Sequence, residues 1–352
     1  MAFEILCCMK SWDSSVYNHL MPVALHPKVT KLWIVRPRKS EYGEIPKAEY
    51  VLTPAGTKFM QWHKIYKACR EVARRSNVKA VISFNPIPYG MLAYFASRPT
   101  HKPIHLGFIG ADWNKYSQGF MGPFLLKHYK QADFITVTGS LMKSQMVKKG
   151  LNADNITLLP HSINVDRFPI SDPQQAKYNF IFVGELIPRK RVDIILKAFC
   201  RVNRKCPQTK LCIVGSGPLE ASLKQQAIHL NLTDHVDFIG YTCEVNRYVS
   251  QSKIMLIASE SEGFPFSLVE GICCGLVSVT TPVGTIRDHI INETNGLFVT
   301  PGNADELADK LCRLTEDDKL YKTLRTASLK LRDSFSYASA TMVWDEWLKT
   351  IH

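Results

Sequence analysis

The stretch 178–214, YNFIFVGELIPRKRVDIILKAFCRVNRKCPQTKLCIV, contains the pattern that decides the fold class. Residues 178–183 form a short run of aromatic and β-branched side chains, which predicts a buried strand. Residues 192–205 predict a helix, and residues 210–214 predict a second strand. Strands that are joined through a helix cannot form a tight hairpin, so they lie parallel in a sheet that helices cover.

The same alternation continues toward both ends of the chain. The second half contains further predicted strands at 236–239, 254–258 and 277–280 and predicted helices at 219–230 and 267–275. The first half contains predicted strands at 3–9, 31–37, 78–84, 103–110, 133–139 and 155–161 and predicted helices at 57–76, 117–131 and 140–149. These two series predict an α/β protein with two doubly wound, Rossmann-like domains.

The domain boundary is predicted from a polar, proline-containing stretch at 166–175, which reads as a linker. We therefore expect an N-terminal domain of residues 1–171 that is completed by residues 338–352, and a C-terminal domain of residues 172–337. The last predicted helix carries a strong apolar stripe, and we expect it to pack back across both domains. Doubly wound sheets bind ligands at the carboxyl ends of their strands, which predicts a site in the cleft between the domains.

The composition excludes several classes of protein. Of the 352 residues, 45% are hydrophobic and 21% are charged, which indicates a folded chain. No apolar run approaches the roughly 18 residues of a membrane-spanning helix, and residues 1–9 lack the features of a signal peptide, so we expect a cytoplasmic location. The ten cysteines are scattered without a Cys-x-x-Cys pair. We therefore expect reduced thiols, no metal site and no cofactor.

The excess positive charge lies in the first half of the chain. Residues 1–170 carry 23 Lys or Arg against 10 Asp or Glu, a balance of +13, whereas the rest of the chain carries 21 of each. Such asymmetry indicates that the first half meets an anionic partner, such as a membrane surface, a phosphorylated lipid or a nucleic acid. A basic but otherwise ordinary surface remains an alternative.

The richest candidate site is the loop at 259–266, which follows the predicted strand 254–258. Gly263 permits a close approach to a ligand, and the amide groups at the start of the next helix suit a diphosphate. Glu262 and Glu270 are separated by seven residues and would bracket this anion site. Two alternatives stay open, because Glu270 also fits a capping box with Ser267, and Glu262 also fits a solvated loop carboxylate.

At this loop the sequence resembles the retaining glycosyltransferases of family 4, or glycosyl transferases group 1. Their signature is a Glu, seven residues and a second Glu, usually beginning Glu-Gly-Phe/Leu-Pro, and Glu262-Gly263-Phe264-Pro265 with Glu270 matches it. The resemblance extends almost continuously over residues 178–312. Further matching segments, in the order usual for the family, are residues 182–190, 214–219, 236–240, 282–284 and 295–299.

The resemblance implies the GT-B fold, in which two Rossmann-like domains flank an interdomain cleft. It implies a metal-independent, retaining hexosyltransferase that moves a sugar from a nucleotide-diphosphate sugar to an acceptor hydroxyl. The acceptor would be a carbohydrate or a lipid-linked molecule, in the biosynthesis of a cell-envelope polysaccharide or a glycolipid. Attack would occur on the front face of the sugar, with the leaving phosphate accepting the proton, so that the protein contributes position and charge.

The resemblance also implies roles for individual residues. Glu262 would hold hydroxyls of the donor sugar, Glu270 would take the ribose hydroxyls, and Lys190 with the amide groups near Leu268 would neutralise the diphosphate. Residues 240–241 would lie near the base. The implied donor-binding residues are Arg189, Lys190, Gly240, Tyr241, Glu262, Gly263, Phe264, Leu268 and Glu270, and the implied catalytic residues are Glu262, Lys190 and Asp112.

Several positions depart from the family pattern. Glu185 stands where an arginine is usual, so one diphosphate cation is lost, and Arg189 or Arg191 would compensate. The usual His-Gly-x-Asp begins with Ile109, so a histidine near the reacting sugar is missing, although Asp112 is retained. The glycine-rich loop after the first strand is also absent. These losses favour one alternative, a catalytically inactive sugar-nucleotide-binding or scaffold protein of the same fold.

Two other functions are not expected. Gly215 and Gly217 fit a tight turn between a strand and a helix, and they do not complete a dinucleotide-binding fingerprint. A nucleic-acid-binding protein would share the basic first half, yet no nucleic-acid-binding motif is present. We therefore predict no nucleic-acid partner.

The helix predicted at 57–76 indicates a further partner, an anionic membrane surface. Its basic side chains and Trp62 suit a peripheral enzyme at the inner face of the membrane that acts on a lipid-linked or anionic acceptor. The basic residues on or near it are Lys64, Lys67, Arg70, Arg74 and Arg75. An ordinary core stripe is the alternative, and it would consist of Trp62, Ile65, Tyr66, Cys69 and Val72.

Overall fold

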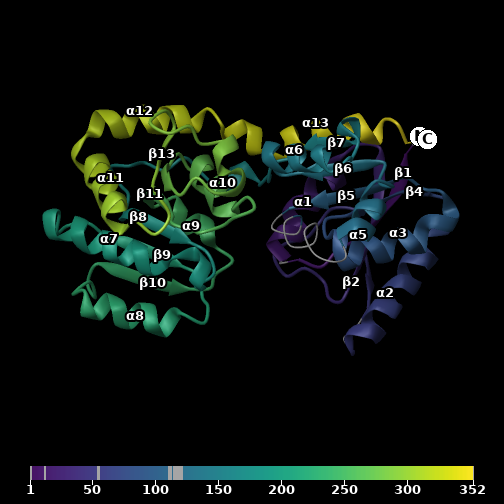
Figure 1. Ribbon diagram of the computed structural model, residues 1–352, viewed down its shortest axis with the longest axis horizontal. Coiled ribbons are helices and arrows are strands. Elements are labelled where there is room, and N and C mark those ends of the chain that lie inside the picture. Colours follow the sequence, from purple (N-terminus) through teal and green to yellow (C-terminus); the bar gives the residue numbers. More distant parts are fainter. Residues whose placement is uncertain (1, 12, 54–55, 110–112, 114–121, 352) are drawn as a thin grey trace. The chain divides into compact units, whose positions relative to one another are not determined.

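The computed structural model describes residues 2–11, 13–53, 56–109, 113 and 122–351. The chain forms two compact units, the first made of Met1–Ser162 with Tyr337–His352 and the second of Ile163–Ser336 (Figure 1). Each unit contains one parallel sheet with helices on both faces. The fold is therefore α/β, with two doubly wound, Rossmann-like domains.

The sheet of the first unit has seven strands in the order β3-β2-β1-β4-β5-β6-β7. Its strands are β1 (Phe3–Cys8), β2 (Val29–Arg36), β3 (Ala48–Leu52), β4 (Val78–Ser83), β5 (Ile104–Phe108), β6 (Phe134–Val137) and β7 (Ile156–Leu158). Its helices are α1 (Asp13–Leu25), α2 (Lys58–Ala73), α3 (Met91–Ser97), α5 (Gly122–Tyr129), α6 (Ser140–Lys148) and α13 (Tyr337–Leu348). The strand order reverses between β1 and β4, which is where such sheets bind ligands.

Alternation along β1 separates the two cores of this unit. Leu6 and Cys8 pack in a core with side chains of α2, α3, α5 and α6. Ile5 and Cys7 point to the opposite face, where α1 and α13 supply the partners. Because successive side chains of a strand point to opposite faces, a central strand buried on both faces is apolar along most of its length, and in β1 only Glu4 departs from this.

The sheet of the second unit has six strands in the order β10-β9-β8-β11-β12-β13. Its strands are β8 (Tyr178–Val183), β9 (Leu211–Val214), β10 (Val236–Gly240), β11 (Ser252–Ile257), β12 (Val277–Thr280) and β13 (Gly296–Phe298). Its helices are α7 (Val192–Lys205), α8 (Glu220–His229), α9 (Val245–Val249), α10 (Phe266–Cys273), α11 (Ala304–Glu316) and α12 (Asp318–Leu329).

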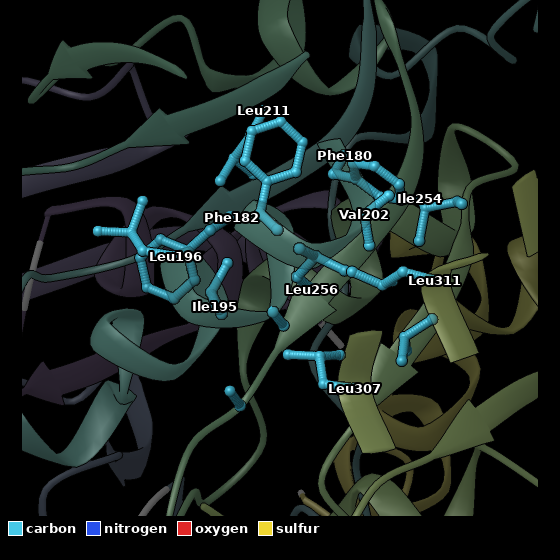
Figure 2. Close-up of a cluster of buried hydrophobic side chains, with 14 of the residues drawn as sticks. Phe180, Phe182, Ile195, Leu196, Val202, Leu211, Ile254, Leu256, Leu307 and Leu311 are labelled. Atoms are coloured by element: carbon cyan, nitrogen blue, oxygen red, sulfur yellow. The ribbon is translucent and has the colours of Figure 1, made fainter. Parts of the chain in front are cut away.

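The main core of the second unit lies between this sheet and helices α7, α8, α11 and α12. Figure 2 shows Phe180 and Phe182 of β8 among Ile195 of α7, Leu256 of β11 and Leu311 of α11. Helices α9 and α10 pack on the opposite face with Ile181 and Met255. Both faces of β8 and β11 are therefore covered, so ligands can reach these strands only at their ends.

The structure moves the domain boundary toward the N-terminus. The predicted linker 166–175 is packed within the second unit, where Phe168 is buried in the core and the amide of Ser171 donates to the carbonyl of Cys274 at 2.8 Å. The second unit begins at Ile163, whose amide donates to the carbonyl of Phe335 at 2.9 Å. The prolines and polar residues of 166–175 thus belong to a packed loop of the second unit and do not form a free linker.

Some elements match their sequence predictions and others were missed. Strand β8, helix α7 and strand β12 have the predicted bounds. Helix α1 was missed because Pro22 lies inside it, and an interior proline normally argues against a helix. Strand β3 was missed because none of its side chains is fully buried: they are exposed or half-buried, and the strand forms the edge of the sheet.

Two further findings concern both units. Within the ranges that the structure describes, no helix combines the length and the apolar character that crossing a bilayer requires. All ten cysteines lie in these ranges, and each is a free thiol.

Candidate functional site

The candidate site forms at the carboxyl ends of β8 and β11. These strands are neighbours in the sheet, and the strand order reverses between them, because β9 follows β8 on the other side. The loop after β8 contains Arg189 and Lys190, and the loop after β11 contains Glu262. Parallel strands end at the same edge, so residues 72 and 73 positions apart in sequence meet at the reversal point.

Glu262 is paired with two cations. The ammonium group of Lys190 donates to Oε1 of Glu262 at 2.5 Å, and the guanidinium of Arg189 donates to Oε2 at 3.1 Å. The Glu262 side chain is 6% exposed and the Lys190 side chain 14% exposed. Glu262 is therefore not a solvated loop carboxylate, because its charge is shielded from water and held by partners.

Two hydroxyl groups that the sequence did not indicate support this carboxylate. The hydroxyl of Ser259 donates to Oε1 of Glu262 at 2.6 Å, and the hydroxyl of Thr281 donates to the carbonyl of Ser259 at 2.6 Å. Both residues are buried. Thr281 directly follows β12, and one residue separates Ser259 from the end of β11. This placement at strand ends was the signal available in the sequence.

The loop after β12 supports the same backbone. The amide and the hydroxyl of Thr285 both donate to the carbonyl of Gly263, at 3.0 and 2.9 Å. Gly284 has φ +57°, and a Cβ atom there would lie 2.2 Å from the carbonyl oxygen of Glu262. The close contact requires glycine, and it fixes the backbone on either side of the Glu262 side chain.

Helix α10 begins at Phe266, with Pro265 as its N-cap and no side-chain cap. Ser267 is therefore inside the helix, and the capping box with Glu270 does not form. The amide of Leu268 donates to the carbonyl of Pro265 at 3.1 Å, so this predicted diphosphate donor is engaged within the first turn.

Glu270 is buried in α10 and is 8% exposed. Burial raises the pKa of its carboxyl to about 7, and the Arg167 guanidinium counteracts part of that rise. The carboxyl is thus poised between its neutral and ionised forms near neutral pH. A group that can donate hydrogen bonds to it would favour the ionised form.

Two other predicted donor residues occupy different surroundings. The Phe264 ring is buried and stacks on His289 at 4.6 Å, so only the backbone of Phe264 can serve a ligand. Gly240 ends β10 with φ +78°, and Tyr241 beyond it is 73% exposed. Strand β10 lies two strands from β8, roughly 10 Å at the usual spacing, which a nucleotide can span.

The structure shows the surroundings of the residues that depart from the family pattern. Glu185 is exposed, and Arg191 is engaged with Glu260 at 2.8 Å and Asp193 at 3.1 Å. Arg189, which contacts Glu262, is therefore better placed to replace the missing cation. Ile109 is half-buried against a core of the first unit. Asp112 lies outside the described residues.

No set of three or more His, Cys, Asp or Glu side chains within the described ranges could hold a metal ion. The charged groups at the ends of β8 and β11 are instead cations and carboxylates, a set suited to binding phosphate and hydroxyl groups.

Comparison with known proteins finds a family match in the second unit. Residues 166–331 match the family model described as glycosyl transferases group 1. This part of the chain is similar to glycosyl transferases group 1. The matched region includes Lys190, Glu262 and Glu270, the residues on which the resemblance in sequence rested.

The similarity to individual proteins covers most of the chain. An uncharacterised glycosyltransferase of Methanocaldococcus jannaschii is 23% identical over 281 residues, covering 79% of this chain and 77% of the relative. N-acetyl-alpha-D-glucosaminyl L-malate synthase of Bacillus anthracis is 25% identical over 269 residues, covering 72% and 70%.

The fold of the whole chain also has close structural neighbours. Anabaena HepE in complex with UDP-glucose has a TM-score of 0.78 at 16% identity, with 99% of this chain and 100% of that chain covered. Sucrose-phosphate synthase of Thermosynechococcus elongatus has a TM-score of 0.79 at 17% identity, with 99% and 98% covered. These likenesses confirm the GT-B fold class of two Rossmann-like domains.

Proposed function

We propose that the protein is a metal-independent, retaining hexosyltransferase that moves a sugar from a nucleotide-diphosphate sugar to an acceptor hydroxyl. The family match supports glycosyl transfer, and the bound UDP-glucose of the HepE structure supports a nucleotide-sugar donor. The name of the Bacillus anthracis relative, N-acetyl-alpha-D-glucosaminyl L-malate synthase, supports a sugar as the group that is transferred. Assembly of a cell-envelope polysaccharide or a glycolipid is the setting that we favour.

One observation carries this proposal, the meeting of Lys190, Arg189 and Glu262 at the ends of β8 and β11. A donor diphosphate would bind the two cations, which carry one positive charge more than Glu262 neutralises. The carboxylate of Glu262, no longer saturated by Lys190, would then accept hydrogen bonds from the sugar hydroxyls. Glu270 would accept hydrogen bonds from the ribose, and residues 240–241 would lie near the base.

The proposed reaction depends on the positioning of the two substrates and on stabilisation of the leaving diphosphate, and it uses no nucleophile from the protein. As the bond between the anomeric carbon and the diphosphate breaks, negative charge grows on the leaving oxygen, where Lys190 and Arg189 would stabilise it. The acceptor hydroxyl would attack from the same face, and its proton would pass to the leaving phosphate. The protein then contributes by holding donor and acceptor in a reactive geometry.

For the acceptor we propose a carbohydrate or a lipid-linked molecule that reaches the enzyme at an anionic membrane surface. The first unit carries 23 Lys or Arg and 11 Asp or Glu, a balance of +12, whereas the second unit has 21 and 20, a balance of +1. A cytoplasmic location at the inner face of the membrane fits this charge. No nucleic-acid partner is proposed.

The decisive experiment compares Glu262→Gln and Lys190→Ala with the unaltered protein. Release of UDP from UDP-glucose in the presence of an acceptor panel is the measurement. We expect each variant to lose roughly a hundredfold or more in turnover, because Lys190 would stabilise the charge that develops on the leaving oxygen and Glu262 would position the sugar, while the circular dichroism spectrum is unchanged. Lys224→Ala breaks an exposed Lys–Glu pair of similar kind and is the control. Near-normal turnover in both site variants would overturn the proposal.

A catalytically inactive sugar-nucleotide-binding protein is the second candidate, and the exposed Glu185 favours it, because it stands where the family usually has a cation. The same assay separates the two functions. An inactive binder would show a raised melting temperature with UDP-glucose but would release no UDP with any acceptor, whereas an enzyme would show both.

A further inference from the structure

Helix α2 in the first unit carries exposed apolar side chains in addition to those that it buries in the core. Ile65, Cys69 and Val72 are buried against the sheet, as an ordinary core stripe requires. Three and six residues before Ile65 stand Trp62 and Phe59, which are 41% and 81% exposed; at 3.6 residues per turn Trp62 lies next to this stripe and Phe59 lies further round toward solvent. The core stripe therefore explains the second half of α2 but not its first two turns.

The exposed turns are surrounded by positive charge. Met60, another large apolar side chain, is 52% exposed beside them. Helix α2 contains four Lys or Arg and a single acidic residue, Glu71. Lys58, Lys64 and Lys67 are exposed, and none of them has an ion pair among the described residues. Exposed aromatic side chains on the same helix turns as unpaired lysines complement the interface of a bilayer that contains anionic lipids.

The position of these turns in the fold links them to the reaction. Helix α2 follows β3, so its first turns lie at the carboxyl edge of the sheet of the first unit. This is the edge at which a doubly wound domain binds its ligand. A membrane that contacts these turns would present its headgroups to the same edge.

We propose that the first two turns of α2, with Phe59, Met60 and Trp62 inserted and Lys58, Lys64 and Lys67 around them, dock the protein on an anionic bilayer. We call these six residues the α2 docking surface. The aromatic rings enter the headgroup region, and the lysines bind anionic lipid. The inference deepens the proposed function and rests on it in one respect, since the docked surface delivers a lipid-linked acceptor to the first unit.

Vesicle flotation tests the docking surface directly. The unaltered protein is expected to float with vesicles of phosphatidylcholine and phosphatidylglycerol at low salt, and to bind far less to phosphatidylcholine alone or at high salt. Replacing Phe59 and Trp62 together by Ala is expected to weaken binding about tenfold or more. Replacing Lys64 and Lys67 together by Gln is expected to weaken it by a similar factor and to reduce its salt dependence.

Matched controls remove equivalent side chains elsewhere. Ile228→Ala with Met342→Ala deletes two apolar side chains that are 52% and 67% exposed, and Lys319→Gln with Lys330→Gln deletes two exposed charges. Both control variants are expected to float as the unaltered protein does. Equal loss in a control and in an α2 variant would overturn the inference, and so would the absence of binding to anionic vesicles at low salt.

Two further measurements keep the outcome unambiguous. The rise in melting temperature with UDP-glucose shows that each variant is folded, and its absence in the unaltered protein would contradict the proposed function without touching the docking surface. Light scattering without lipid tests a second copy as the occupant. A dimer that dissociates when Phe59 and Trp62 are replaced would assign this surface to self-association and overturn the membrane inference.

Discussion

At the scale of single residues, the chemistry of Glu270 depends strongly on its surroundings. Its carboxyl lies in α10, and burial raises its pKa to about 7. An ordinary Glu would be ionised throughout the neutral range, whereas Glu270 changes its charge within that range. Binding of a ligand that requires the ionised form must therefore respond to pH.

We expect the affinity for UDP-glucose to rise about tenfold between pH 6 and pH 8, because the ionised fraction of a group with a pKa near 7 rises from about one tenth to about nine tenths. Ribose hydroxyls donate hydrogen bonds, so they favour the carboxylate, and the donor diphosphate keeps its charge across this range. Isothermal titration calorimetry at both pH values measures the change. Glu270→Gln should bind with little pH dependence; an equally steep slope in that variant would assign the effect to another group.

The residues of the candidate site were predictable to different degrees. Glu262, Glu270 and Lys190 lie in segments whose letters match a family motif, and the structure brings Glu262 and Lys190 together. Ser259 and Thr281 were not predicted, because a serine or threonine at a strand end has no spacing that reveals its partner. Their roles arise only when β11 and β12 lie side by side in register.

At the scale of elements, the site depends on contact between consecutive loops. The loop after β12 packs against the loop after β11 through Thr285 and Gly284, and the backbone oxygens of Glu262 and Gly263 lie within 2.2 and 2.5 Å of the position of a Cβ atom on Gly284. Backbone atoms cannot rotate away as side chains can. A larger residue at this position must shift one loop relative to the other.

Gly284→Ala is therefore expected to lower donor turnover by about tenfold or more, since small displacements of reacting groups are costly in rate. Steady-state kinetics of UDP release checks this. Gly302→Ala is the matched control, because Gly302 has φ +81° but a Cβ atom there would meet only the tip of Arg191 at 3.7 Å. Both variants carry the backbone strain of an alanine at positive φ, so a similar loss in both would contradict the loop contact as the cause.

Element prediction succeeded where the chain is apolar on both sides. Strands β8 and β12 lie inside the sheet and consist mainly of aromatic and β-branched residues, which favour a strand. Prediction failed for α1, which buries Pro22 inside a helix, and for the segment 166–175, whose prolines belong to a packed loop. In both places the packing of the folded protein outweighs a local signal.

At the scale of the whole molecule, the two units have separate cores. The helix α13 belongs to the first unit, where Trp344 is fully buried beside Phe84 and Phe134. All six tryptophans of the chain lie in the first unit. Tryptophan fluorescence therefore reports the unfolding of this unit, while circular dichroism reports both.

Trp344→Ala is expected to destabilise the first unit by roughly 3–5 kcal/mol, because it leaves a large cavity in a packed core. Urea unfolding followed by tryptophan fluorescence gives this value. Trp62→Ala, at a residue 41% exposed, should cost less than about 1 kcal/mol. The stabilisation by UDP-glucose, followed by circular dichroism, should persist in both variants; its loss in Trp344→Ala would show that the two units do not fold separately.

The chain starts and finishes in the first unit, which makes the second unit an insertion between Ser162 and Tyr337. The two ends of the insertion adjoin each other, since Ile163 forms a bridge with Ser336 and its amide donates to Phe335. A unit whose two ends lie next to each other can be replaced as a whole, because the two junctions with the first unit stay close together. Under the proposed function, chimeras that exchange residues 163–336 between relatives would exchange the nucleotide-sugar preference. They would retain the acceptor and the membrane docking of the protein that supplies the first unit.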